Sequence, residues 1–439
     1  MFKLLKVLIT VLIASFYFFP VDFTFLPTNT KNLLAAIGIV FVIFELVRKK
    51  DFSIPQQFLI LMMICSMVSI ASLISITYNQ TPDDTYVTYI RSAVIWLSGA
   101  FSVGYIIRSI HGRIDVPLIV HYLIGVCLFQ CASAMLIEFI PNVRNFVDSY
   151  VEQGQDLLQK MGRLYGVGAS LDVAGSRFAT ILVAIAFLLV SSPKRVSVGL
   201  AVFYTFSFVI ISVIGNMIAR TTIIGTAIGF LWMILSIFFQ TRTRPVGFVE
   251  NSTGKLITIL FTFGVLVVLS IFLYNTFPEI QDHMRFAFEG FFNWIETGEW
   301  QTDSTNKLQS MVVWPESLKT WIIGDGYFAN SRYDPNYLGD STDQGFYMGT
   351  DIGYLRFLFY FGITGLVWII AVIAYSAFIC ADQFKNYAWL FILALGVGLA
   401  VWAKVATDIF LFFCMFLCAA ALQETPEETE PAAETPPLP

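Results

Sequence analysis

Charged residues are scarce in this chain, and their scarcity excludes most classes of soluble protein. Only 13% of the 439 residues are Asp, Glu, Lys or Arg, whereas 57% are hydrophobic, and the mean hydropathy is +0.73. Soluble domains carry about 25% charged residues. The formal net charge of −5 adds little, because the acids gather in loops and at the C-terminus, and no nucleic-acid partner is expected. The composition predicts an all-α polytopic integral membrane protein.

Cysteine and histidine are also sparse, which argues against a disulfide framework and against a metal site. All six cysteines lie in apolar runs, where cysteine usually serves as a small packing residue. The three histidines, His111, His121 and His283, show no metal-ligand spacing. We therefore expect no metal and no other cofactor.

Long apolar runs are the main feature that is present. A membrane-spanning helix needs about 20 mostly apolar residues, and twelve runs are close to that length. They cover residues 4–20, 33–48, 57–78, 92–108, 116–140, 177–192, 197–217, 222–240, 255–275, 352–377, 387–403 and 405–422. The first run lacks a small-residue cleavage site, which favours a retained helix over a signal peptide. The sequence thus predicts about 12 transmembrane helices.

Basic residues in the short connections predict the orientation. With the N-terminus inside, every inner connection holds at least one Lys or Arg, whereas the short outer connections hold few. Both termini are then cytoplasmic. The expected domains are residues 1–275 with nine helices and an outer loop at 141–176, a large outer loop at 276–350, three helices in 351–422, and a disordered acidic Pro-rich tail at 423–439.

Ionisable residues recur at the predicted outer ends of the helices. They are Arg177, Arg220, Asp351, Arg356, Lys404 and Asp408, and Arg163 adds a basic group from the Gly-rich end of the outer loop at 141–176, where it can also be a simple loop residue. A basic side chain at membrane depth costs roughly 2.5–3.5 kcal/mol and usually faces a cavity or a partner. Simpler interpretations exist, since arginines can extend to lipid head groups, Asp351 can cap the following helix, and Lys404 can pair with Asp408 at i,i+4 spacing. Five basic groups on one side of the membrane also suit an anion such as a diphosphate.

The large outer loop adds side chains that suit a carbohydrate. Four tryptophans, Trp294, Trp300, Trp314 and Trp321, precede a stretch rich in Tyr, Asp, Asn and Gly. Aromatic faces beside acidic and amide groups suit sugar rings and hydroxyls, although Trp and Tyr also form interfacial belts in membrane proteins. A loop of this length is more often functional than a spacer.

Short motifs in this chain resemble those of the bacterial O-antigen polymerases (Wzy-like) and O-antigen ligases. The resemblance includes one large outer loop before the last three helices, Arg220 at an outer junction, and Lys404 in the penultimate outer hairpin. It also includes the segments Ile322-Ile-Gly-Asp-Gly-Tyr327, Thr350-Asp351-Ile-Gly-Tyr-Leu355 and Phe361-Gly-Ile-Thr-Gly365. Ligases of this group usually have His-Asn before the Tyr-Leu pair. This chain has Asp351-Ile352 there, which favours a polymerase.

The resemblance implies a metal-independent glycosyltransferase of GT-C-like architecture in the bacterial inner membrane, with its active site facing the periplasm. Such an enzyme polymerises undecaprenyl-diphosphate-linked oligosaccharide repeat units into the O-antigen of lipopolysaccharide or into capsular polysaccharide. Its partners are the lipid-linked oligosaccharide and membrane lipid, with a chain-length regulator as a candidate. By this resemblance the catalytic residues are Asp351, Arg220 and Arg285. The residues expected to bind diphosphate or substrate are Arg163, Arg177, Arg356, Lys404, His283 and Tyr354, with His283 a rival to Asp351 as the base.

Two other functions remain open from the sequence. An O-antigen ligase would differ only in its acceptor, which is a lipid A core or a protein. A lipid-linked oligosaccharide flippase is less favoured, because it is expected to carry charges at mid-depth in several helices and to lack a long outer loop.

Overall fold

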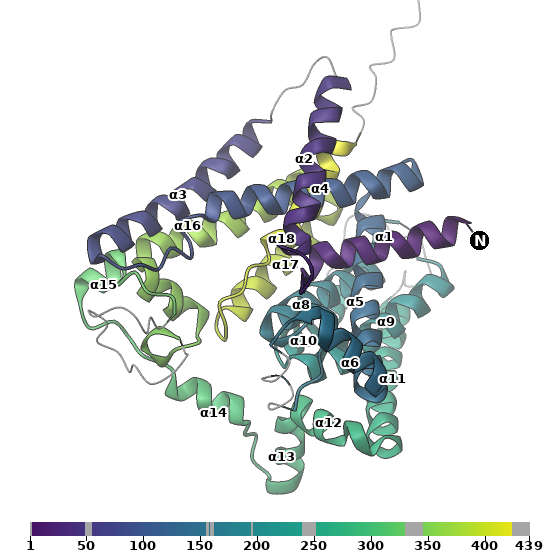
Figure 1. Cartoon of the computed structure of the whole chain (residues 1–439). Coiled ribbons are helices and arrows are strands. Elements are labelled where there is room, and N and C mark those ends of the chain that lie inside the picture. The colour runs from purple at the N-terminus through teal and green to yellow at the C-terminus, as the bar shows by residue number, and fades with distance from the viewer. Residues whose placement is uncertain are drawn as a thin grey trace, which may run out of the picture.

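The fold is almost entirely helical. A computed structural model describes residues 2–48, 55–154, 158, 162–194, 196–238, 252–329 and 346–423 (Figure 1). Within them, eight helices are long and apolar enough to cross a membrane. These are α2 (Thr30–Arg48), α3 (Gln56–Asn79), α4 (Tyr89–His111), α5 (Val116–Phe139), α8 (Leu171–Ser191), α9 (Val198–Ile218), α11 (Ser252–Thr276) and α16 (Gly353–Gln383). The chain is therefore an all-α polytopic membrane protein, as its composition predicts.

The other four predicted spans correspond to shorter helices. They are α1 (Phe2–Phe18), α10 (Thr222–Phe238), α17 (Ala388–Val401) and α18 (Phe410–Leu422), with 17, 17, 14 and 13 residues. A helix of 14 residues extends ~21 Å at 1.5 Å per residue, which is shorter than a hydrocarbon core of ~30 Å. The count of about twelve spans therefore stays a prediction.

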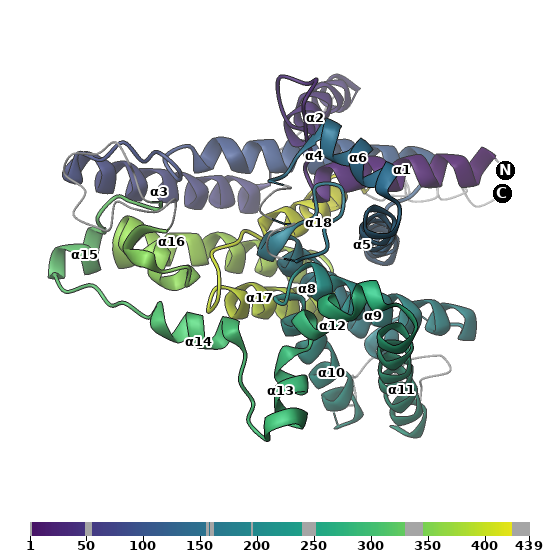
Figure 2. The same ribbon diagram turned by 60° about the horizontal axis from the view of Figure 1, so that its bottom comes forward.

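The large loop after α11 is built from short helices. In chain order it contains η1 (Pro278–Ile280), α12 (Gln281–Ala287), α13 (Glu289–Thr297), α14 (Asp303–Ser310), α15 (Leu318–Ile323) and η2 (Tyr347–Gly349). These elements run from the side of α9 and α11 across to α16 in both views (Figures 1 and 2). Part of the Tyr- and Asp-rich stretch, residues 330–345, and the tail from residue 424 lie outside the described residues.

The remaining short elements connect the helices. Helix α6 (Pro141–Tyr150) follows α5, the 3-10 turn η3 (Lys385–Tyr387) precedes α17, and the strands β1 (Asp22–Phe23) and β2 (Val151–Glu152) pair antiparallel. The two strands join the end of α1 to the segment after α6.

Helix α8 forms the centre of the bundle. Every residue from 174 to 190 is buried, and α8 packs against α5, α9, α10 and α17. Small residues allow this close packing, which is typical of helix interfaces in membranes. A Cβ atom on Gly225 of α10 would lie only 2.2 Å from the Cα atom of Ala179. The N-terminal end of α8 is thereby held among several helices, and the candidate site lies at that end.

Helix α16 is broken near its start. Phe361 and Gly362 have φ values of −134° and +67°, outside the helical range. The carbonyls of Phe359 and Tyr360 at the break accept hydrogen bonds from the N–H groups of Asp325 and Gly326, at 2.6 and 3.0 Å. Backbone groups at membrane depth must find partners inside the protein, and the turn after α15 supplies them. The Thr364 hydroxyl also donates to the carbonyl of Ile322 at 2.9 Å, so two of the short motifs, 322–327 and 361–365, contact each other directly.

Gly362→Ala should destabilise the protein. A Cβ atom at residue 362 would lie 2.3 Å from the carbonyl group of Ile322, and a φ of +67° strains any L side chain. We expect a loss of about 1–3 kcal/mol in the free energy of unfolding, seen as a lower melting temperature in detergent. Gly396→Ala is the matched control, because its Cβ atom would meet nothing within 4 Å. Equal melting temperatures for the two variants would contradict the importance of the break.

Candidate functional site

An ion pair joins three distant segments at the N-terminal end of α8. The Lys404 ammonium lies 2.8 Å from Oδ1 of Asp172 and donates to the Thr221 hydroxyl at 3.0 Å. The Thr221 hydroxyl in turn donates to Asp172. Lys404 therefore pairs with Asp172 on α8, and the alternative of an i,i+4 pair with Asp408 is wrong. The reason is that the connection between α17 and α18 is not helical, so the spacing rule does not apply there.

Glycines allow the helices and connections around this ion pair to pack closely against one another. A Cβ atom on Gly175 would lie 2.9 Å from the Cβ atoms of Ala219 and Thr221, so α8 lies directly against the α9–α10 junction. A Cβ atom on Gly353 would lie 2.8 Å from the carbonyl oxygens of Trp402 and Val405. The start of α16 is thus packed onto the α17–α18 connection, beside Lys404.

Tyr354 helps to fix that second contact. Its N–H donates to the carbonyl of Trp402 at 3.2 Å, and its hydroxyl donates to the carbonyl of Leu399 at 2.7 Å. Both hydrogen-bond donors of Tyr354 therefore hold the start of α16 against the end of α17. Its predicted role in binding substrate stays a prediction.

Two arginines share one aromatic ring. The guanidinium groups of Arg220 and Arg163 lie 3.9 and 4.9 Å from the ring centre of Phe286 on α12. Arg220 also forms an ion pair with Glu289 of α13, and its buried Nε has no hydrogen-bond partner within the described residues. Burial lowers the pKa of Arg163, with Asp172 opposing and Arg220 adding to that shift. Arg163 and Arg220 therefore form one cationic group near Asp172.

A second cation, Arg356, lies in the first turn of α16. Nη1 of Arg356 lies 3.5 Å from Oδ1 of Asp351, and Nη2 donates to the carbonyl of Phe328 at 3.1 Å. The guanidinium lies 3.7 and 4.3 Å from the ring centres of Phe328 and Phe346. Since Arg356 is only 8% exposed, it does not extend to lipid head groups, and that alternative is wrong.

Asp351 is a half-buried carboxyl that pairs with Arg356 just before α16. The N-cap residue of α16 is Ile352, and no side chain caps the helix, so the capping interpretation of Asp351 is wrong. Oδ1 of Asp351 is buried and accepts no hydrogen bond from the described residues. Burial raises the pKa of Asp351 to about 6, with Arg356 opposing the shift, Asp172 adding to it and Lys404 opposing it. A carboxyl with this pKa can exchange a proton near neutrality.

Three predicted site residues lie outside this cluster. Nδ1 of His283 lies 2.8 Å from the carbonyl oxygen of Gly162, and its Nε2 lies 3.6 Å from Glu138, so His283 ties α12 to the segment carrying Arg163. Arg285 is half exposed and pairs with Glu296 at 3.1 Å. Arg177 is buried over the ring of Phe19, at 5.5 Å from its centre. The structure brings together Arg163, Arg220, Asp351, Arg356 and Lys404.

Three members of the cluster were not predicted from the sequence. Asp172 follows a Gly-rich segment in the first turn of α8, and an acid at the start of an apolar helix was a usable signal. Glu289 and Phe286 gave none, because both lie in an amphipathic stretch and Phe286 is one of 43 phenylalanines.

Neither a metal centre nor a relative identifies the site. Among the described residues, no three His, Cys, Asp or Glu side chains are grouped as a metal ion would need. Comparison of the chain with protein-family models, curated proteins and solved structures gave no match. Function is therefore inferred from the residues and their geometry.

Proposed function

We propose that the protein is a glycosyltransferase that polymerises undecaprenyl-diphosphate-linked oligosaccharide repeat units at the periplasmic face of the bacterial inner membrane. The observation that carries the proposal is the cluster of Arg163, Arg220, Arg356 and Lys404 beside Asp351 and Asp172. Arg356 is buried and the other three cations are half-buried. Cations held partly out of water are costly unless an anion compensates them. A lipid diphosphate is an anion that reaches such a site from the membrane.

Arg220 and Arg163 are the groups best suited to the diphosphate. A planar guanidinium can donate two parallel hydrogen bonds to phosphate oxygens. Arg220 already holds one anion, the carboxylate of Glu289. When the substrate binds, a phosphate oxygen can replace the Glu289 carboxylate as the anionic partner of Arg220. Donors arranged before the reaction stabilise the charge that develops on the leaving group.

Asp351 is the candidate base. The acceptor sugar hydroxyl attacks the anomeric carbon of the donor, the bond from that carbon to the diphosphate oxygen breaks, and the lipid diphosphate leaves with the electron pair. The proton of the acceptor hydroxyl passes to Asp351, whose raised pKa of about 6 suits that role. A single displacement of this kind inverts the anomeric centre.

Aromatic residues of the large loop could bind the sugars. The rings of Tyr327 and Tyr347 stack at 5.3 Å between their centres, and each tyrosine adjoins in sequence a phenylalanine, Phe328 or Phe346, whose ring contacts Arg356. Earlier in the same loop, Trp314 and Trp321 are stacked at 6.0 Å with an angle of 8° between their planes. Flat faces of this kind match the apolar faces of sugar rings.

Surface glycan of a host lacking the gene tests the proposal. A polymerase predicts that the long-chain ladder disappears from gels while a single repeat unit stays attached. Loss of all attached glycan would instead indicate the ligase or the flippase, since both act on every chain. An unchanged ladder would overturn the proposed function altogether. Restoring the gene must restore the ladder.

The rate of glycan transfer should depend on pH through Asp351. Below a pH of about 6 the carboxyl is neutral and cannot accept a proton, and above it the carboxylate can, so the rate should rise with a midpoint near 6. Asp351→Asn should remove this acid limb and lower the rate by about 10²–10⁴-fold. The measurement is the initial rate in detergent from pH 4.5 to 8. The control is Asp303→Asn, an exposed acid of the same loop. If the rate of Asp351→Asn still fell at low pH with the same midpoint, a group other than Asp351 would be the base.

A further inference from the structure

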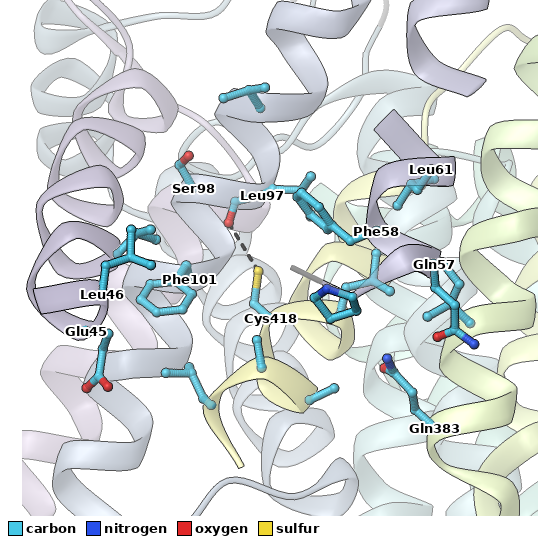
Figure 3. Close-up of a pocket in the computed structure, with 18 residues that line it drawn as sticks. Glu45, Leu46, Gln57, Phe58, Leu61, Leu97, Ser98, Phe101, Gln383 and Cys418 are labelled. Carbon is cyan, nitrogen blue, oxygen red and sulfur yellow. Dashed lines mark hydrogen bonds between the residues drawn. The ribbon is translucent and has the colours of Figure 1, made fainter. Parts of the chain in front are cut away.

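A cavity of ≈ 440 Å³ lies far from the cluster, near the opposite end of α16. Its walls come from α2, α3, α4, α16 and α18, and most of them are apolar (Figure 3). Leu46 and Phe101 form one side and Phe58 and Leu61 the other. At its back the Cys418 thiol donates to the carbonyl of Leu97 at 3.2 Å. Its size is within the range of ligand pockets, about 300–1,000 Å³.

The cavity opens onto the apolar surface of the protein. Helix α2 packs on α4, and α3 packs on α16 and α4, whereas α2 and α3 diverge from one another (Figure 1). Leu46 and Val94, which line the cavity, are 36% and 42% exposed. An apolar cavity beside lipid is filled better by hydrocarbon than by water, because water needs polar partners.

One buried carboxylate borders this apolar space. Glu45 is 7% exposed, and neither of its oxygens accepts a hydrogen bond from the described residues. The nearest guanidinium atoms, Nε of Arg48 and Nη1 of Arg108, lie 3.8 and 4.0 Å away, which is beyond hydrogen-bonding distance. A buried polar group without a donor costs about 1–3 kcal/mol. A ligand that brings an N–H donor would remove this penalty.

The charges around Glu45 indicate the head group. The Arg48 side chain is 54% exposed and can reach an anion at the membrane surface. The Glu45 carboxylate can accept from an ammonium, and the nearby Arg48 guanidinium can donate to a phosphate. The pair therefore matches a head group that carries both an ammonium and a phosphate. An anionic head group without an ammonium would meet Glu45 unfavourably. A polyprenyl tail would leave Glu45 without a donor.

We propose that this cavity binds a glycerophospholipid with a primary-ammonium head group. The acyl chains fill the space between α2 and α3, the ammonium donates to Glu45, and the phosphate accepts from Arg48. With the orientation predicted from the basic connections, this lipid belongs to the cytoplasmic leaflet. The site is separate from the proposed glycosyltransferase site and does not depend on it.

Native mass spectrometry of the full chain, delipidated in detergent and titrated with defined lipids, tests the proposal. Phosphatidylethanolamine should bind at least tenfold more tightly than phosphatidylglycerol. Glu45→Gln should bring the two affinities within about twofold. Ala421→Phe, which places a large side chain in the cavity, should weaken both at least tenfold. Val40→Phe, on an exposed face of α2 (62% exposed) away from the cavity lining, should bind like the wild type.

Three results would overturn the proposal. The first is equal affinity of the wild type for the two lipids. The second is unchanged binding by Ala421→Phe, and the third is displacement of the phospholipid by a polyprenyl lipid. Arg48→Ala is a second variant in case Glu45→Gln does not fold. Arg48 is largely exposed, so its removal should leave the fold intact, and it should weaken phosphatidylethanolamine binding severalfold.

Discussion

Arg220→Ala is expected to reduce glycan polymerisation by about 10²–10³-fold, the usual effect of removing one preorganised donor from a developing anion. Arg220 precedes Thr221, whose hydroxyl donates to Asp172, and it is held by Phe286 and Glu289. The loss should appear as a missing long-chain ladder in cells and as a slower rate in detergent. Arg220→Lys keeps the charge but loses the two parallel donors, so it should recover only part of the rate.

Arg285→Ala is the matched control for Arg220→Ala. Arg285 is also a loop-associated arginine over an aromatic ring, that of Phe292, and it also pairs with a glutamate. Its side chain is half exposed, however, and lies outside the cluster. We expect a ladder of normal length. If Arg285→Ala removed the ladder and Arg220→Ala did not, the proposed diphosphate site would be wrong. Melting temperatures of both variants separate loss of chemistry from loss of folding.

Asp172→Ala and Lys404→Ala should each lower the free energy of unfolding by roughly 2–3 kcal/mol. Removing one member of a buried pair leaves an uncompensated charge, which costs about 3–5 kcal/mol when burial is complete. Here the side chains are 17% and 25% exposed, so a smaller value is expected. The double variant should be less destabilised than the sum of the single variants, because it leaves neither charge unpaired.

A double-mutant cycle measured by thermal unfolding in detergent tests this coupling. The exposed pair Arg285–Glu296 provides the comparison, with a coupling energy expected at about 0–1 kcal/mol. Additive effects of Asp172→Ala and Lys404→Ala would show that the pair contributes nothing to the α8 contact with the α17–α18 connection.

Helix positions could be predicted from the sequence because hydropathy is a local property. The run at 57–78 corresponds closely to α3 (Gln56–Asn79). The run at 177–192 misses the first turns of α8, which begins at Leu171. Those turns contain Asp172, whose charge is compensated by a residue 232 positions away. A window along the chain cannot detect such a partner.

The candidate site was predictable only in part, for a related reason. Charged residues at predicted helix ends identified Arg220, Asp351, Arg356 and Lys404, and a Gly-rich loop identified Arg163, all of which the structure places in one cluster. Which residues face that cluster depends on the rotation of short helices. In α12 the neighbours Arg285 and Phe286 point differently, so that Phe286 meets Arg220 while Arg285 is exposed. The amphipathic periodicity of the sequence does not show which of the two residues faces the cluster.

The break in α16 separates its first eight residues, 353–360, as a short helical segment that is fixed at both ends. At one end of this segment, the carbonyls of Phe359 and Tyr360 accept hydrogen bonds from the turn at 325–326. At the other end, ~9 Å away at 1.5 Å per residue, Tyr354 is fixed to Trp402, and Arg356 lies between the two ends. A displacement of the large loop is therefore transmitted along this segment to Arg356. A growing glycan that pulls on this loop would thus move the cation that pairs with Asp351, the proposed base.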